Sequence, residues 1–331
     1  MPAVPPITQR GSVGLVLPTT QWTISPGHTG STQGENEGTT PGITEVVTRT
    51  CREAESAGAD ALWTVDHLFW PSPMLECLTT LTVAATATTT ATVGSCVLQL
   101  PMRQPAAVAK QAAAIQLLSG GRFILGVGAG SHPAEYDMAG ADFATRGRRL
   151  DDGIAALRRA WDTAGDPTLA YRQEPGPAPV PVWVGGSSDA ARRRAATSAD
   201  GWVPMFIGPD HLRTSIEQLR HDTDAAGRSP EAVTAAVVVM VAVGDDPAVA
   251  DRGAGWLGSL YGLPPKAFHR HLVAGPAAHC AEQVQRFFDA GADHVVAMVA
   301  DDRAVDHFAE LAGALSPATS VARPDLVEVP G

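Results

Sequence analysis

A histidine directly follows an aspartate at the end of an apolar run early in the chain. The run Ala61–Asp66 has the composition of a buried strand, and His67 comes immediately after it. An imidazole can donate or accept a proton near neutral pH, and a neighbouring carboxylate can fix which ring nitrogen carries that proton. Asp66 and His67 therefore predict acid–base chemistry at a strand end. The alternative is a polar pair that only closes the following loop.

Two further apolar runs, 122–128 and 180–185, end in clustered glycines. Backbone N–H groups can converge on an anion where no side chain intervenes, and a hydroxyl at the start of the next helix adds a donor. The two turns therefore predict a phosphate site for a cofactor, with plain strand-to-helix turns as the alternative. A dinucleotide fingerprint is not favoured, because Ser131 occupies the place of its third glycine. The candidate cofactor-binding residues in these turns are Gly128, Ala129, Gly130, Gly185, Gly186 and Ser187.

Several other kinds of site lack their sequence signatures. The four cysteines form no C-x-x-C pair and H-E-x-x-H is absent, so no metal site is predicted. Cys96 lies inside a predicted strand, where a thiol is usually buried and inert. The G-x-S-x-G elbow of many serine hydrolases is also absent.

His271 is the second candidate catalytic residue. It belongs to the long segment Gly244–Ala278, which we expect to cover the mouth of the active site. Arg270 could meet an anionic group, and the imidazole of His271 could exchange a proton during the reaction. The alternative is that the aromatic side chains of this segment pack inward and leave His269 and His271 in solvent.

Eight short apolar runs alternate with amphipathic stretches along the chain. Their interiors are almost continuously apolar, which is typical of parallel strands buried on both faces. Eight such strands favour a (β/α)₈ barrel over a doubly wound open sheet, which usually needs fewer strands. The expected strands are Ser12–Leu17, Ala61–Asp66, Val93–Leu100, Arg122–Gly128, Val180–Gly185, Gly201–Phe206, Ala235–Val243 and His294–Ala300.

The amphipathic stretches supply the helices of this barrel, and we expect one domain over residues 1–331. Long connections after the fourth strand (Ala129–Gly147) and the seventh (Gly244–Ala278) fall on the face where barrel enzymes place their active sites. The clearest expected helices are Ile43–Ala57, Val108–Leu118, Leu150–Ala164, Asp189–Ser198, His211–Ala226, Cys280–Ala290 and Val305–Leu315.

The composition of the chain limits the kinds of partner that it is expected to bind. The 24 basic and 35 acidic residues give a net charge of −11, which argues against binding to nucleic acid or to anionic lipid. The charge-free stretch Cys77–Met102 is interrupted by Gly94 and Pro101, so we expect a helix and a buried strand there instead of a membrane span. Residues Met1–Arg10 have no signal-peptide pattern. We therefore expect a cytoplasmic protein.

These blocks together resemble the luciferase-like monooxygenase superfamily, most closely its branch that uses the deazaflavin coenzyme F420. The resemblance implies a barrel that binds a flavin or deazaflavin at its C-terminal face, with His67 beside the reactive carbon of the ring. The flavin branch more often has Glu-His-His where this chain has Asp66-His67, which favours F420. Cys96 and Val97 match a non-prolyl cis peptide that backs the ring, and the two glycine turns match segments that hold the phosphate and tail. The matching blocks are Leu62–His67, Glu76–Leu81, Gly94–Leu98, Ser119–Gly130, Pro181–Gly186 and Asp200–Trp202.

The function that this resemblance implies is hydride transfer between F420 and a small organic substrate. Two alternatives are an FMN-dependent monooxygenase that uses O₂ and a barrel that binds the cofactor without turnover. A homodimer and a partner reductase for the flavin or F420 are also expected. The related sugar-phosphate dehydrogenases have a glutamate directly after the glycines, where this chain has Ser131 and has Glu135 only four residues later. They also have a tryptophan four residues after the histidine, where this chain has Pro71 and has Trp70 one residue earlier. These departures argue against a sugar-phosphate substrate.

Overall fold

Eight parallel strands form a closed barrel in the computed structural model, which describes residues 7, 11–19, 42–173, 176 and 179–315. The barrel strands are β1 (Ser12–Val16), β2 (Ala61–Thr64), β3 (Thr92–Ser95), β5 (Phe123–Gly128), β6 (Val182–Gly185), β7 (Gly201–Val203), β8 (Thr234–Val243) and β10 (His294–Val299). The ring closes because β10 pairs in parallel with both β1 and β8. A short strand, β4 (Leu98–Gln99), continues the third barrel strand and pairs with β5. The predicted (β/α)₈ barrel and its eight strands are therefore confirmed.

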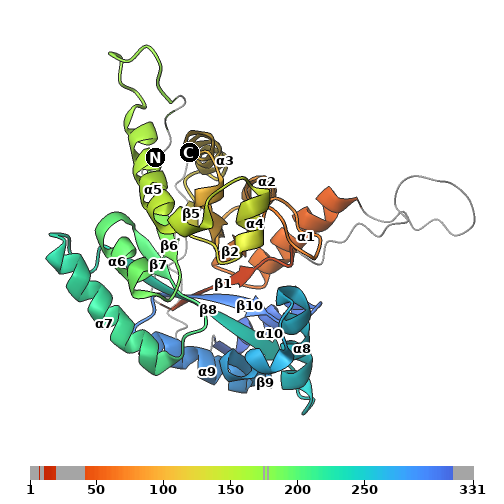
Figure 1. Cartoon of the computed structure of the whole chain (residues 1–331). Coiled ribbons are helices and arrows are strands. Elements are labelled where there is room, and N and C mark those ends of the chain that lie inside the picture. The colour runs from red at the N-terminus through yellow and green to blue at the C-terminus, as the bar shows by residue number, and fades with distance from the viewer. Residues whose placement is uncertain (1–6, 8–10, 20–41, 174–175, 177–178, 316–331) are drawn as a thin grey trace, which may run out of the picture.

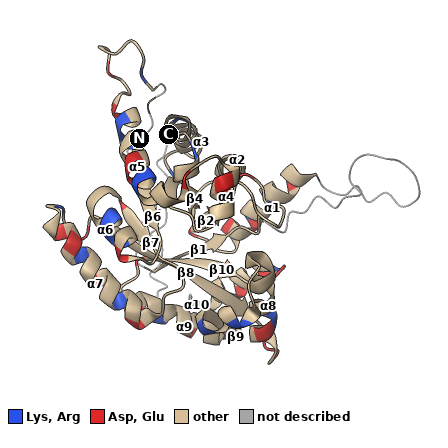
Figure 2. Cartoon of the chain, viewed as in Figure 1, with Lys and Arg blue, Asp and Glu red and all other residues tan. Residues whose placement is uncertain are grey.

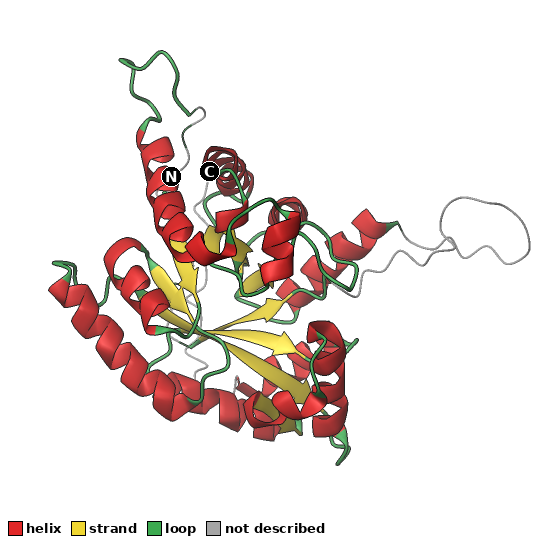
Figure 3. Ribbon diagram, in the orientation of Figure 1, coloured by secondary structure: helices red, strands yellow, loops and turns green. Residues whose placement is uncertain are grey.

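A helix follows each barrel strand and lies on the outside of the barrel, as Figures 1 and 3 show. Each of these helices buries one face against the strands; in α1, for example, Val47, Cys51 and Ala54 are buried. Figure 2 shows that the Lys, Arg, Asp and Glu residues belong to the helices and connections, whereas the strands contain none. The barrel helices are α1 (Ile43–Ser56), α2 (Cys77–Ala87), α3 (Pro105–Leu118), α5 (Arg146–Asp162), α6 (Asp189–Ser198), α7 (Pro209–Ala225), α9 (Ala277–Asp289) and α10 (Ala304–Leu315).

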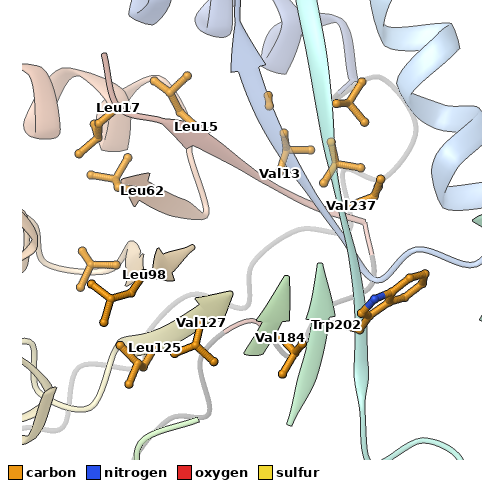
Figure 4. Packing of buried hydrophobic residues seen from close by; sticks show 14 of the residues in the cluster. Val13, Leu15, Leu17, Leu62, Leu98, Leu125, Val127, Val184, Trp202 and Val237 are labelled. Atoms are coloured by element: carbon orange, nitrogen blue, oxygen red, sulfur yellow. The ribbon is translucent and has the colours of Figure 1, made fainter. Parts of the chain in front are cut away.

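The buried side chains form two layers. The outer layer lies between strands and helices, and Figure 4 shows part of it around Leu15, Leu62 and Leu98. The inner layer fills the barrel interior, where the rings of Trp63 and Trp183 lie 5.2 Å apart. The interior around these rings is thus packed.

The two long connections contain regular structure that the sequence analysis treats as loop. Residues 129–147 contain α4 (Pro133–Met138) and a 3₁₀ turn, η2 (Phe143–Thr145). Residues 244–278 contain α8 (Val249–Tyr261), the 3₁₀ turns η3 (Pro265–Ala267) and η4 (His269–His271), and β9 (Leu272–Gly275), which pairs with β8.

The glycines of α8 explain why its sequence does not look helical. Glycine is a poor helix former, and α8 contains three of them. A Cβ atom on Gly253 would lie 2.7 Å from that of Ala242, so the glycine lets α8 pack closely on β8. Tertiary packing therefore outweighs local propensity in this segment.

Two expectations concern the chain ends and membranes. The segment Met1–Arg10, in which no signal peptide is predicted, lies outside the described residues except for Ile7. Within the described part of the chain, no helix has both the length and the apolar character that a membrane span requires.

Candidate active site

A cavity of about 470 Å³ opens at the C-terminal ends of the barrel strands. Most of the residues singled out in the sequence line it. They are Asp66, His67, Cys96, Val97, Gly128, Ala129, Gly130, Gly185 and Gly186. Segments far apart in the sequence therefore meet at one site, as strand order in a barrel requires.

His67 is held by a carboxylate that is distant in the sequence. Its Nδ1 lies 3.0 Å from Oε2 of Glu135, a residue of α4 that is only 3% exposed. Burial alone would raise the pKa of Glu135, but hydrogen bonds from His67, Gln99 and Phe69 outweigh it and lower that pKa. An ionised carboxylate can only accept, so Nδ1 donates in this contact, and in the neutral ring Nε2 then carries the lone pair.

Glu135 also fixes the chain around His67. Its Oε1 accepts hydrogen bonds from the backbone N–H groups of Leu68, at 2.6 Å, and Phe69, at 3.3 Å. The side-chain amide of Gln99 donates to Oε2 of Glu135 and to the carbonyl of Asp66. One buried side chain thus ties α4 to the turn after β2 and to the end of β4.

Asp66 does not have the orienting role that the sequence predicts. Its Oδ1 pairs with Nη2 of Arg103 at 2.7 Å, and its Oδ2 accepts from the backbone N–H of Gln99 at 2.8 Å. Burial raises the pKa of Asp66, and the guanidinium of Arg103 offsets part of that rise. Successive side chains of an extended chain point in opposite directions, so the neighbour in sequence is poorly placed to hold His67. Glu135 does so instead.

Trp70 and His132 complete the surroundings of His67, and no sequence pattern predicts a role for either. The Trp70 ring stacks on His67 with a centroid distance of 3.8 Å and an interplanar angle of 24°. His132 meets both rings edge-on. The indole N–H of Trp70 donates to the carbonyl of Leu260 in α8 at 3.0 Å, so the helix and the turn after β2 support each other.

The ligating atoms of His67, His132 and Glu135 lie within 4.8 Å of one another. This spacing would suit a metal ion, whereas the sequence predicts no metal site. Both carboxylate oxygens of Glu135 already accept hydrogen bonds from the protein. In this structure Glu135 orients the imidazole of His67 through these hydrogen bonds.

Cys96 and Val97 form one wall of the cavity. The peptide bond between them is cis, as the resemblance predicts. Burial raises the pKa of Cys96 to about 12, so its thiol is unsuited to act as a nucleophile. A Cβ atom on Gly128 would lie 2.5 Å from Cγ2 of Val97, and one on Gly185 would lie 2.8 Å from Cγ1. These glycines therefore make room for the Val97 side chain.

The side of the cavity formed by α5 and α6 is basic. Arg146, the first residue of α5, and Arg194 of α6 both line it. Ser188 lines it too and caps α6, accepting a hydrogen bond from the N–H of Ala191. The guanidinium of Arg194 already pairs with Asp151 at 2.5 Å, so the N-terminus of α6 and Arg146 are the groups on this side best suited to an anion. Ser187, predicted here, does not line the cavity, because its hydroxyl bonds the carbonyl of Met205.

His271 is not brought to the cavity wall. It lies in η4 and is half-buried; its ring contacts Phe206 at 5.4 Å, and its Nε2 accepts a hydrogen bond from Arg270 at 2.8 Å. Burial and the charge of Arg270 lower the pKa of His271. His269 is exposed and pairs with Asp251. Phe206, and not His271, therefore faces the cavity from this region.

Comparison with known proteins decides the family. The profile of the luciferase-like monooxygenases matches residues 22–294. The chain belongs to this family. Membership confirms the predicted family and, with it, the prediction of an oxidoreductase.

Two curated relatives share parts of the sequence. An uncharacterised protein of Mycobacterium tuberculosis is 36% identical over 167 residues, covering 47% of this chain and 57% of the relative. A phthiodiolone/phenolphthiodiolone dimycocerosates ketoreductase of the same organism is 28% identical over 202 residues, covering 55% and 52%. The chain thus spans little more than half the length of these relatives.

Two solved structures share the fold of this luciferase-like protein. An F420-dependent secondary alcohol dehydrogenase in complex with an F420–acetone adduct has a TM-score of 0.69 and 20% identity, over 81% of this chain and 94% of that one. The oxygenating constituent of 3,6-diketocamphane monooxygenase of Pseudomonas putida, in complex with FMN, has a TM-score of 0.68 and 18% identity, over 92% and 98%. At these identities the likeness concerns the fold alone.

Proposed function

We propose that the protein is an F420-dependent oxidoreductase that transfers hydride between the deazaflavin and a small organic substrate. The observation that carries the proposal is the oriented imidazole of His67, held by buried Glu135 at the mouth of the barrel. The sequence pair Asp66-His67, the dehydrogenase of the same fold that binds F420, and the partly matching ketoreductase support it.

The residues present fit such a cofactor. Val65, Cys96 and Val97 give the cavity an apolar patch suited to a planar ring. Arg146 and the N-terminus of α6 suit the anionic groups of its tail, and Arg194, which pairs with Asp151, lies on the same side of the cavity. When bound, the cofactor supplies the hydride chemistry, and the protein supplies position and electrostatics.

The chain's own residues then handle the proton and the water. Glu135 keeps the proton on Nδ1 of His67, so Nε2 is the atom that can accept one or pass one on. Trp70 covers one face of the imidazole, and Tyr261 lies next to Trp70 in the cavity lining. These rings exclude water from one side of His67 and hold its orientation.

The second candidate is an FMN-dependent monooxygenase supplied by a partner reductase. The FMN-bound neighbour of the same fold favours it, since the basic side of the cavity suits a terminal phosphate equally well. The predicted single domain, homodimer, reductase partner and cytoplasmic location stay predictions under either function.

An anaerobic titration with each cofactor tests the proposal. We expect F420 to bind at least about tenfold more tightly than FMN, as measured by quenching of tryptophan fluorescence. We also expect hydride transfer to bound F420 without O₂. Tighter binding of FMN, or turnover only with reduced FMN and O₂, would favour the monooxygenase.

A further inference from the structure

The side of the cavity opposite the arginines is built almost entirely from hydrocarbon and aromatic rings. Figure 1 places α8 across the barrel from α5 and α6, which carry Arg146 and Arg194. The rings of Trp70 and Phe206 each lie against Tyr261, at 6.3 Å and 6.4 Å, so they form one continuous surface. We call this surface the apolar wall; its lining residues are Trp70, Met74, Phe206, Trp256, Leu260 and Tyr261.

The polar hydrogens of the apolar wall already have partners within the protein. The indole N–H of Trp70 donates to the carbonyl of Leu260, and that of Trp256 donates to Oδ1 of Asp302, both at 3.0 Å. The hydroxyl of Tyr261 lies 3.7 Å from Sδ of Met298. Burial raises the pKa of Tyr261 to about 12, which keeps that hydroxyl neutral. Apart from the Tyr261 oxygen, which can still accept a hydrogen bond, the apolar wall therefore offers a ligand ring faces and aliphatic carbon.

No cation stands on this side of the cavity among the lining residues of the described chain. The charged lining residues are Asp66, which pairs with Arg103, and the two arginines of α5 and α6. A carboxylate or phosphate placed against the apolar wall would lose its hydration without gaining a partner. A polyhydroxylated sugar would likewise leave hydroxyl groups unpaired.

Building on the proposed function, we infer that the substrate is an uncharged, hydrophobic ketone or its secondary alcohol. Its hydrocarbon body would lie against the apolar wall, and its single oxygen would lie near the imidazoles of His67 and His132. In the reducing direction the carbonyl carbon gains the hydride that the reduced deazaflavin supplies, and the oxygen gains a proton. The reverse direction oxidises the alcohol and returns both.

A matched pair of probes tests the inference by direct binding. Acetophenone and 4-acetylbenzoate share a ring and a ketone and differ by one carboxylate. Calorimetric titration of the full chain, with and without saturating oxidised F420, should give acetophenone at least about tenfold higher affinity. Lengthening its alkyl chain should tighten binding about fourfold for each added CH₂ that is buried.

A charge placed on the apolar wall should reverse this preference. Leu260→Arg keeps the backbone carbonyl that Trp70 uses, but adds a cation at the cavity. We expect it to weaken acetophenone binding and to strengthen 4-acetylbenzoate binding, each about tenfold. Leu263→Arg is the matched control, because Leu263 is exposed two residues past α8 and does not line the cavity.

The outcomes separate this inference from the proposed function. Equal or tighter binding of 4-acetylbenzoate by the unaltered chain would overturn the inference, even if F420 binds. Failure of the whole alkyl series to bind would overturn it too. If the ketones discriminate as expected but F420 does not bind, the apolar wall stands and the proposed cofactor is wrong.

Discussion

Replacing Glu135 by glutamine should disable His67 while leaving the shape of the site almost unchanged. The carboxamide retains an oxygen for the backbone N–H groups of Leu68 and Phe69. In place of Oε2 it would present an N–H₂ group to Nδ1 of His67. In the unaltered protein that nitrogen donates to the carboxylate at 3.0 Å. Two donors cannot share that contact, so the ring proton should move to Nε2. The lone pair on Nε2 would then be lost.

The size of the effect follows from these contacts. General acid–base help is worth about 100- to 10,000-fold, so we expect kcat for Glu135→Gln to fall at least about 100-fold. Loss of hydrogen bonds to a buried charged group should also reduce the free energy of unfolding by about 1.5–3 kcal/mol. Cofactor affinity should change little, because Glu135 is not among the residues that line the cavity.

Two assays separate this role from a purely structural one. Steady-state kinetics with F420 and an alcohol give kcat and KM, and ¹⁵N NMR of labelled histidine reports which nitrogen of His67 is protonated. Asp137→Asn is the matched control, because Asp137 is an exposed acid on the same helix. A Glu135→Gln protein that kept more than about a third of its kcat and an unchanged His67 tautomer would refute the reasoning.

Three further predictions concern the core, the glycine turn and the connection after β8. Burial lowers the pKa of His294 to about 3, below its unfolded value, so stability should be lost as pH falls below about 6.5, by about 2 kcal/mol at pH 5. His294→Gln, which keeps an acceptor for Trp63, should remove this loss. Urea unfolding at pH 7 and pH 5 measures it, and an equal loss of unfolding free energy in the variant and the unaltered protein would contradict the prediction. Gly128→Val should push Val97 toward the cavity and weaken cofactor binding at least about tenfold by fluorescence titration; unchanged binding would show that the turn can adapt. His271→Ala should reduce kcat less than about tenfold, since its ring lies off the cavity wall, and a 100-fold fall would restore its predicted catalytic role.

The barrel could be predicted because its strands can be recognised from the local sequence. Runs such as Ala235–Val243 are apolar throughout, and this can be seen in the sequence without knowing which residues they contact. Helix α8 could not be predicted, because the packing of Gly253 on β8 decides its conformation and its glycines conceal it. Local pattern thus yields the frame, and tertiary packing decides the inserted segments.

The sequence predicted where the site lies, but not which side chains form hydrogen bonds with one another there. Strand ends and glycine turns placed His67 and Gly128 at the barrel mouth, and the family resemblance placed Val97 there, where the structure has all three. The contact of His67 with Glu135 joins residues 68 positions apart, and no spacing rule connects them. The sequence favoured Asp66 because it is adjacent, whereas the fold gives Asp66 to Arg103. A buried glutamate in an inserted helix could only be recognised once that helix was placed.

The most direct test of the central claim is anaerobic reduction of oxidised F420 by a hydrophobic secondary alcohol, followed by the loss of deazaflavin absorbance. We expect turnover with the unaltered protein. With His67→Ala we expect a rate at least about 100-fold lower and F420 affinity within about threefold, because the imidazole handles the proton while other residues hold the cofactor. Turnover that is unaffected by His67→Ala would contradict the account, and so would failure of the unaltered protein to bind F420.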